Sequence, residues 1–283
     1  MRSAQPTSPP AAPQPVVATV RAPAKFRLRL TQLLADKPVI WALAGRDLKS
    51  RYKQSALGPA WVVFQPLALL VAFTIGFHSV AHVRTEGVPY SLFALTGLVV
   101  WTYFQAVTMS AVGSLVNNYP LVRWTACPRI AMPLATLMSN LPSFAIPAAA
   151  ALIAAGATGY LTIQALLLPF LFVWLVFLVA AVAIFMSAIT VRARDVLSVT
   201  PFLLQVMLFL SPVGYGTSQL SPVLRAVISI NPLTGLIDAW RWSLLGIKPS
   251  TTAVVISLSL TSIGIVSAWR LFRSLEVLMA DDI

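Results

Sequence analysis

The sequence predicts an all-α polytopic membrane protein with about six transmembrane helices. Hydrophobic residues make up 58% of the 283 positions, only 10% are charged, and the mean hydropathy is +0.83. Soluble domains carry about a quarter charged residues, so the composition excludes that class. Apolar stretches of about 20 residues, the length that crosses a bilayer, recur along the chain. The formal net charge of +12 gathers mainly before the first of these stretches.

Residues 1–36 are predicted to form a disordered cytoplasmic tail. Residues 1–24 of this segment are rich in proline, alanine, glutamine, serine and threonine, and their prolines interrupt every apolar run. This pattern is neither a secretory signal peptide nor a helix. A transmembrane domain is expected over 37–272, followed by a second cytoplasmic tail at 273–283.

A basic amphipathic helix is predicted directly before the first span, lying along the membrane interface. At a period of 3.6 residues its apolar face contains Trp41, Ala44, Leu48, Tyr52 and Ala56. Its other faces carry Arg46, Lys49 and Lys53, which would meet lipid phosphates. Asp47 precedes Arg51 by four residues, a spacing that allows a helical ion pair. Gly58 and Pro59 then end the helix.

Six segments meet the length requirement for a membrane span. They are 60–80, 90–115, 131–155, 161–190, 197–215 and 251–270. The third contains Pro133, Pro142 and Pro147, which helices in lipid tolerate when neighbouring groups satisfy the freed backbone. The fourth is longer than required and is expected to tilt or to extend beyond the bilayer.

Two short apolar segments, 224–230 and 235–246, lie between the fifth and sixth spans. They are too short to cross, so short re-entrant or interfacial helices are expected. A lone charge at mid-bilayer costs about 2.5–3.5 kcal/mol on the insertion scale. Asp238 and Arg241 are three residues apart, so we expect them to pair on one helical face.

Lysine and arginine are concentrated before the first span and in alternate loops after it. Cytoplasmic segments carry such an excess of cations. Both termini are therefore predicted to be cytoplasmic. Because these cations flank predicted spans, we expect a lipid surface and no nucleic acid as their partner.

The sequence lacks the residue patterns that several functions require. None of the eight carboxylates falls inside a predicted span, which leaves Asp238 as the one candidate for a proton or sodium relay. The phosphate-binding motif G-x-x-x-x-G-K-S/T is absent. His78 and His82 are four residues apart, but two ligands do not make a zinc site, and no metal is expected. The single cysteine, Cys127, excludes an internal disulfide. A membrane glycosyltransferase or acyltransferase would need catalytic acids that are not seen.

Aromatic residues cluster near the predicted span ends, where an interfacial belt explains most of them. A subset facing a conduit would offer flat faces for sugar rings. The candidates for such a pathway are Trp61, Trp101, Tyr103 and Tyr215.

Six blocks in order resemble the permease subunit of ABC-2-type ABC exporters of the polysaccharide and polyol-phosphate class, which exports O-antigen, capsule or teichoic acid. The blocks are RDLKSRYKQSALGPAW (46–61), VPYSLFALTGLVVWTYF (88–104), SLVNNYPLVRWTACPRIAMPLA (114–135), VRARDV (191–196), LSPVGYG (210–216) and NPLTGLIDAWRW (231–242).

The resemblance implies a homodimer that moves a lipid-linked polysaccharide across the bacterial plasma (inner) membrane. Two separate cytoplasmic ABC ATPase subunits would bind ATP and Mg, and this chain would bind no cofactor. The ATPase-coupling residues would be Arg46, Asp47, Arg51, Tyr52, Arg123 and Arg129. Asp238 and Arg241 would stabilise an outer gate. The alternatives are an ABC-2-type exporter of a drug or lipid, or a gated channel without an ATPase.

Overall fold

A computed structural model describes residues 36–53, 58–80, 83, 85–118, 120–121 and 127–278. Within these ranges the chain is helical and contains no strand. The prediction of an all-α polytopic membrane protein is confirmed. The predicted N-terminal tail lies outside the described residues apart from Asp36.

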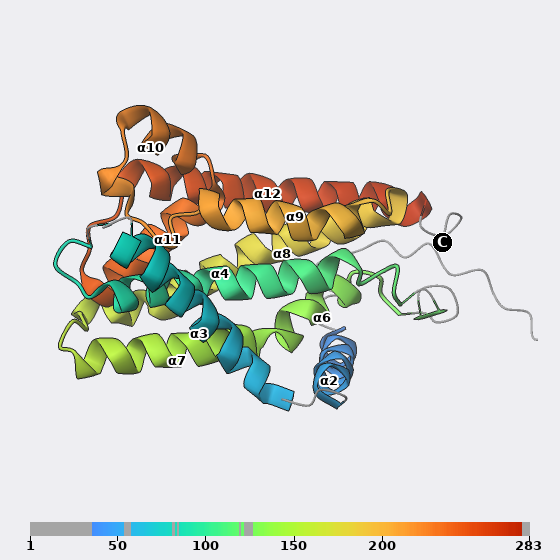
Figure 1. The fold of residues 1–283 in the computed structure, drawn as a ribbon. Helices are drawn as coiled ribbons and strands as arrows, with labels where there is room; N and C mark the ends of the chain where they lie inside the picture. The colour runs from blue at the N-terminus through green and yellow to red at the C-terminus, as the bar shows by residue number, and fades with distance from the viewer. Residues whose placement is uncertain are drawn as a thin grey trace, which may run out of the picture.

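Most of the chain forms a bundle of helices that run roughly along one axis (Figure 1). The bundle consists of α3 (Trp61–Phe73), α4 (Tyr90–Val112), α6 (Ala131–Ser139), α7 (Leu141–Ala157), α8 (Leu168–Arg192), α9 (Val196–Leu210) and α12 (Thr251–Leu278). Shorter helices lie at its two ends: α2 (Lys37–Lys53) at one, and α10 (Pro222–Ser229) and α11 (Pro232–Leu245) at the other. Short 3₁₀ or π segments complete the path: η1 (Gly58–Ala60), η2 (Thr74–Val80), η3 (Ile163–Leu167) and η4 (Thr217–Gln219).

Each of the six predicted spans coincides with helix. Four segments of the described chain are long and apolar enough to cross a membrane: Tyr90–Val112, Ala131–Ala157, Ile163–Arg192 and Thr251–Leu275. The other two, Trp61–Phe77 and Val196–Leu210, are shorter apolar helices. The first of these continues as the π-helix η2, and the second ends before Ser211 and Pro212. The predicted short helices are present as α10 and α11.

The third predicted span is broken into α6 and α7. Asn140 ends α6 and begins α7, with φ −99° and ψ 4°. Pro142 follows at the start of α7 and has no N–H to continue the α6 hydrogen-bond ladder. Pro147, by contrast, lies inside an unbroken α7.

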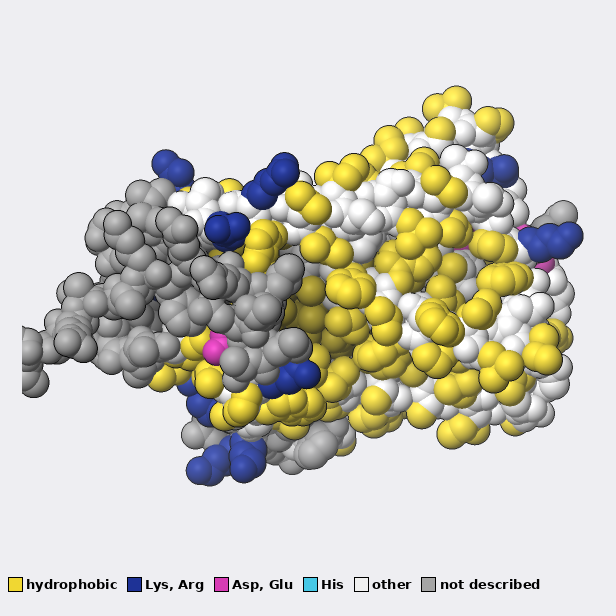
Figure 2. All heavy atoms as spheres, turned by 180° about the vertical axis from the view of Figure 1, so that it is seen from behind, with side chains coloured by type: hydrophobic (Ala, Val, Ile, Leu, Met, Phe, Trp, Pro, Cys, Tyr) yellow, Lys and Arg dark blue, Asp and Glu magenta, His cyan; other side chains and the backbone are white. Residues whose placement is uncertain are grey.

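On the face shown in Figure 2, an apolar belt covers the middle of the bundle, and basic side chains lie towards its ends. Exposed side chains of the belt include Phe64 on α3, Ile153 on α7, Phe170 on α8 and Phe202 on α9. In water this surface would be unfavourable, whereas hydrocarbon covers it at no cost. The belt therefore marks the part of the molecule that lies in lipid.

Helix α4 forms the centre of the core, packed against α7, α8 and α11. Its side chains Leu98, Trp101 and Tyr103 are fully buried. A second, smaller apolar cluster lies at the α2 end and joins four separate elements. Its buried members are Leu115, Ile130, Met132, Ala188, Phe272 and Leu275.

Helices α11 and α12 approach each other most closely at Gly235. A Cβ atom there would overlap the carbonyl group of Ala253 and crowd Ser257. The Ser257 hydroxyl donates a hydrogen bond to the carbonyl of Pro232, at the start of α11. Gly235 therefore fixes the spacing that holds α11 against the bundle.

Gly235→Ala is expected to lower stability by about 1–3 kcal/mol, because the added methyl group has no space between α11 and α12. Thermal unfolding of the purified protein in detergent measures this. Gly156→Ala is the matched control, since a Cβ at Gly156 meets no atom within 4 Å. The control should be neutral or slightly stabilising. Equal melting temperatures for the two variants would contradict the packing argument.

Candidate functional site

Polar side chains gather at both ends of the bundle, and the predicted site residues divide between them. We define the α2-end cluster as Arg46, Asp47, Arg51, Ser110, Asn118 and Asn140. We define the α10-end cluster as Glu86, Thr217, Ser218, Asp238 and Arg241. The two clusters lie at opposite ends of α4 (Figure 1).

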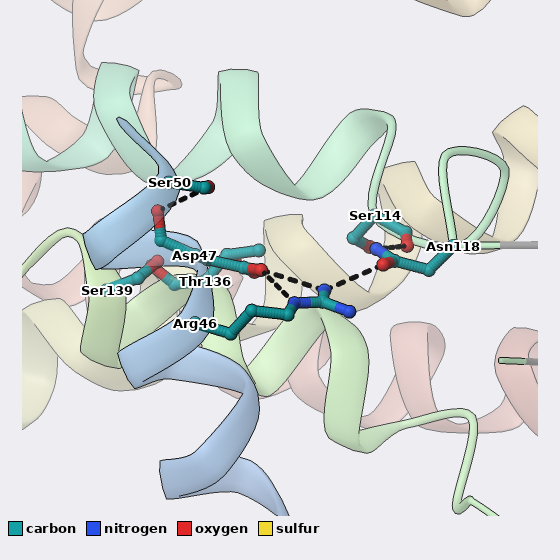
Figure 3. Close-up of polar contacts among 7 residues, drawn as sticks. All are labelled: Arg46, Asp47, Ser50, Ser114, Asn118, Thr136 and Ser139. Carbon is teal, nitrogen blue, oxygen red and sulfur yellow. Dashed lines mark hydrogen bonds and ion pairs between the residues drawn. The ribbon is translucent and has the colours of Figure 1, made fainter. Parts of the chain in front are cut away.

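In the α2-end cluster, helix α2 lies across the bundle and packs against α6. Ala44 is buried at this contact, with 3% of its surface exposed. The Arg46 guanidinium lies between the Asp47 carboxylate and the Asn118 side chain (Figure 3). It donates to Asp47 Oδ1 at 2.8 Å and to Asn118 Oδ1 at 2.7 Å. These contacts join α2 to the segment that follows α4.

Arg51 does not pair with Asp47, contrary to the sequence-based expectation. Its guanidinium turns towards the bundle and donates to Asn140 Oδ1 at 2.5 Å and to Ser110 Oγ at 3.0 Å. Asp47 instead accepts hydrogen bonds from its neighbour Arg46. The reason is that tertiary packing brings the buried amide oxygen of Asn140 to Arg51. The spacing of residues along one helix cannot predict a partner from another segment.

The other predicted coupling residues are less completely described. Tyr52 lies in α2, but its side chain is not among the described ones, and Arg123 lies outside the described residues. Arg129 is half-buried just before α6, next to the buried Ile130. It therefore lies at the same end of the bundle as α2.

At the opposite end, Arg241 on α11 organises the turn between α9 and η4. Only 1% of its surface is exposed. The guanidinium donates to the carbonyl oxygens of Pro212 and Val213, both at 2.6 Å, and to that of Tyr215 at 3.3 Å. It also lies 3.7 Å from the ring centroid of Phe93 on α4. Buried carbonyl groups need hydrogen-bond donors. After the end of α9, Arg241 supplies the donors that backbone N–H groups would supply inside a helix.

Asp238 is held by groups other than Arg241. Its carboxylate accepts a 2.8 Å hydrogen bond from Thr217 Oγ1 and another from the backbone N–H of Ser250. The predicted direct pairing with Arg241 is not made, because the guanidinium is occupied by backbone carbonyls. Burial raises the pKa of the Asp238 carboxyl group, and the charge of Arg241 opposes part of that rise.

A small cavity of about 20 Å³ lies beside Asp238, lined also by Glu86, Thr217, Arg241 and Lys248. That volume holds about one water molecule and no larger ligand. Glu86 accepts a 2.6 Å hydrogen bond from Ser218 Oγ, which joins the loop before α4 to η4. The α10-end cluster is thus a closed polar contact between segments.

The four predicted pathway aromatics divide by exposure. Trp101 and Tyr103 are 0% exposed, so they pack the core and do not lie on a surface that could face a conduit. Tyr215 is half-buried and donates to the carbonyl of Phe209. Trp61 is 49% exposed and borders an open groove between α3, α4 and α9.

This groove has a volume of about 390 Å³. Its lining residues are Trp61, Phe64, Gln65, Ala68, Leu69, Gln105 and Leu208. Two primary amides therefore lie within an otherwise apolar surface at the level of the belt. The Trp101 indole N–H donates to Gln105 Oε1 at 3.1 Å and positions one of the amides.

Sequence reasoning missed Ser110, Asn118 and Asn140 in the α2-end cluster, and Glu86, Thr217 and Ser218 in the α10-end cluster. Only Asn140 carried a usable signal, being a polar residue two positions before a proline inside a predicted span. The others become significant only through contacts with residues far away in the chain.

This fold and these clusters define a helical polytopic membrane protein. An interfacial helix lies across one end, and two short helices close the other. The chain belongs to the ABC-2 type transporter family, whose model matches residues 38–245.

Curated relatives fall in one functional group. The chain is 27% identical over 207 residues to an O-antigen export system permease protein, RfbA, of Klebsiella pneumoniae, covering 70% of this chain and 77% of that protein. It is 23% identical to an RfbA of Myxococcus xanthus, and the match covers 74% of this chain and 81% of that protein. It is 22% identical to the polysialic acid transport protein KpsM of Escherichia coli, and the match covers 73% of this chain and 81% of that protein.

Asp238→Asn is expected to preserve the fold and to raise stability at neutral pH. The amide oxygen can still accept from Thr217, and a neutral side chain costs less to bury. Because the folded-state pKa of Asp238 is raised, the wild type should gain stability on acidification from neutrality towards about pH 4, and the variant should lack that gain.

Melting temperatures of both proteins across this pH range test the expectation. Asp195→Asn, at an exposed carboxylate near the α2 end, is the control. A difference between wild type and Asp238→Asn that does not change with pH would contradict it.

Proposed function

We propose that this chain is the membrane subunit of an ATP-driven exporter that moves a lipid-linked polysaccharide across the bacterial inner membrane. The observation that carries the proposal is the match of residues 38–245 to the ABC-2 type transporter family, together with relatives named for O-antigen export and polysialic acid transport. A bundle with an interfacial helix at one end supports it, because such a helix offers a soluble partner a surface outside the lipid.

The α2 end is proposed to face the cytoplasm. Most described cations lie there: Lys37, Arg46, Lys49, Arg51, Lys53, Arg129, Arg192, Arg194, Arg270 and Arg273. The opposite end carries Arg225, Arg241 and Lys248, and the first two are turned onto backbone carbonyls. Cation excess marks the cytoplasmic side of membrane proteins, which supports this orientation.

Two cytoplasmic nucleotide-binding subunits are proposed to dock at this end and to bind ATP and Mg. Helix α2 and the segment around Arg129 would form the contact, and Arg123 precedes Arg129 by six residues in the sequence. The absence of a phosphate-binding motif from this sequence supports an energy source on another polypeptide.

A second copy of the chain is proposed to cover the groove beside Trp61. Gln65 is exposed on α3 among apolar side chains, and Gln105 lies beside it in the groove. Exposed amide groups are unfavourable in hydrocarbon, even with Gln105 Oε1 bound by Trp101, and this supports a neighbouring chain at this face. Trp61 and Phe64 form an edge-to-face pair with centroids 5.4 Å apart and offer aromatic faces suited to sugar rings.

The α10-end cluster would then close the far side of the conduit. Helix α10 projects from that end of the bundle (Figure 1), whereas α11 is packed against α12 and α4. Arg241 and Asp238 hold η4 and the preceding turn against α4 and α11. Opening would require these contacts to change, which makes the cluster a suitable gate.

Deleting the gene in its host should abolish the surface polysaccharide while lipid-linked precursor accumulates inside. Immunoblots of surface glycan and extraction of the lipid-linked pool measure the two outcomes. Restoration by the wild-type gene is the control. Unchanged surface glycan in the deletion strain would reject the proposed substrate, and purification of an active chain without a nucleotide-binding partner would favour a channel.

The double variant Arg123→Glu and Arg129→Glu should uncouple export from ATP hydrolysis, because it places negative charge at the proposed ATPase contact. Export is expected to fall about tenfold or more, with loss of transport-stimulated ATPase activity. Arg192→Glu with Arg270→Glu makes the same change in net charge at the same end. Wild-type export by the first variant, or equal defects in both, would contradict the assignment of this loop.

A further inference from the structure

The break between α6 and α7 is closed by a hydrogen-bond network centred on Asn140. This side chain is 0% exposed. Its Nδ2 donates to the Thr136 carbonyl at 2.7 Å and to Ser110 Oγ at 3.1 Å, which uses both amide hydrogens. Its Oδ1 accepts from Arg51 at 2.5 Å. The backbone carbonyl of Asn140 also accepts from the Ser143 N–H at 2.9 Å.

Ser110 completes the network from α4. Its hydroxyl donates to the Ala106 carbonyl at 2.8 Å and accepts from both Arg51 and Asn140. One donor and two acceptor positions are thus all occupied. Around the buried Asn140, these satisfied hydrogen bonds favour one arrangement of the network, since losing any member leaves others unpaired.

Packing separates the two halves of the broken span. Helix α6 contacts α2, α8 and, less extensively, α4, whereas α7 contacts mainly α4 and α3. The halves touch each other only slightly. A displacement of α2 would therefore be passed to α6 first, and Asn140 joins α6 to both α7 and α4.

We infer that Arg51 is a positioning residue that fastens α2 to the α6–α7 break and transmits movement of α2 to the membrane-embedded bundle through Asn140. The inference rests on the proposed function, because it assumes that a nucleotide-binding partner moves α2. It assigns Arg51 an inward role, distinct from a direct contact with that partner.

The geometry explains why the residue is an arginine. Two nitrogens of one planar guanidinium reach acceptors on two different helices, Asn140 Oδ1 and Ser110 Oγ. A lysine ammonium carries the same charge on a single nitrogen and does not reproduce this fork. Arg51→Lys should therefore be impaired although its charge is kept.

The test uses the full complex of the chain with its nucleotide-binding subunit, together with export in cells. Arg51→Gln, Asn140→Ala and the double variant form a mutant cycle. Each single variant should lower export about tenfold while ATP hydrolysis and partner binding stay within about twofold of wild type. The double variant should be no worse than either single one, because both remove the same connection.

Two further variants keep the test decisive. Ser110→Ala removes the hydroxyl that both partners share and should give the same separation of hydrolysis from export if Arg51→Gln fails to assemble. Arg270→Gln removes one positive charge from an exposed position on α12, outside the proposed ATPase contact, and serves as the matched control. Its export should equal that of wild type.

The possible outcomes test the positioning role of Arg51 separately from the proposed function. Additive defects, weakened partner binding by Arg51→Gln, or full activity of Arg51→Lys would overturn the positioning role and leave the proposed function standing. Failure of the wild-type complex to export glycan on ATP hydrolysis would overturn both.

Discussion

Backbone polar groups inside a lipid-embedded bundle must find hydrogen-bond partners within the protein, and this structure depends on how that is done where helices stop. Two interruptions lie within or beside the belt: the α6–α7 break at Asn140 and the turn after α9. No water is available in hydrocarbon to satisfy the freed groups. At the first, the Tyr103 hydroxyl donates to the Leu137 carbonyl and the Asn140 amide donates to that of Thr136, while Arg51 binds the amide oxygen of Asn140. At the second, Arg241 donates directly to the backbone carbonyls of the turn.

Arg51 and Arg241 stabilise these two interruptions in different ways. Arg241 is completely enclosed and binds consecutive carbonyls of a single turn, so its contacts fix local backbone geometry. Arg51 belongs to an interfacial helix and binds side chains on two other helices, so its contacts fix how separate elements sit relative to one another. The first arrangement suits a closed end of the bundle, and the second suits a connection that carries movement.

Between these ends, α4 forms a buried axis on which both clusters depend. Phe93 near its start lies under the Arg241 guanidinium, and Ser110 near its end accepts from Arg51. The buried residues between them, including Trp101 and Tyr103, make this helix part of the main core. Rearrangement at either end is therefore expected to involve the peripheral helices that pack on α4 more than α4 itself.

The sequence by itself determined the class, the positions of the six apolar segments, the interfacial helix and the two short helices, because apolar length and helical periodicity are local properties of the chain. Only the tertiary structure decided which polar groups meet. Asp47 and Asp238 lie at helical spacings from Arg51 and Arg241, yet each arginine binds acceptors from elsewhere in the chain. Burial likewise placed Trp101 and Tyr103 in the core and left Trp61 exposed. Hydrogen-bond partners and exposure depend on segments distant in sequence, and no local pattern contains them.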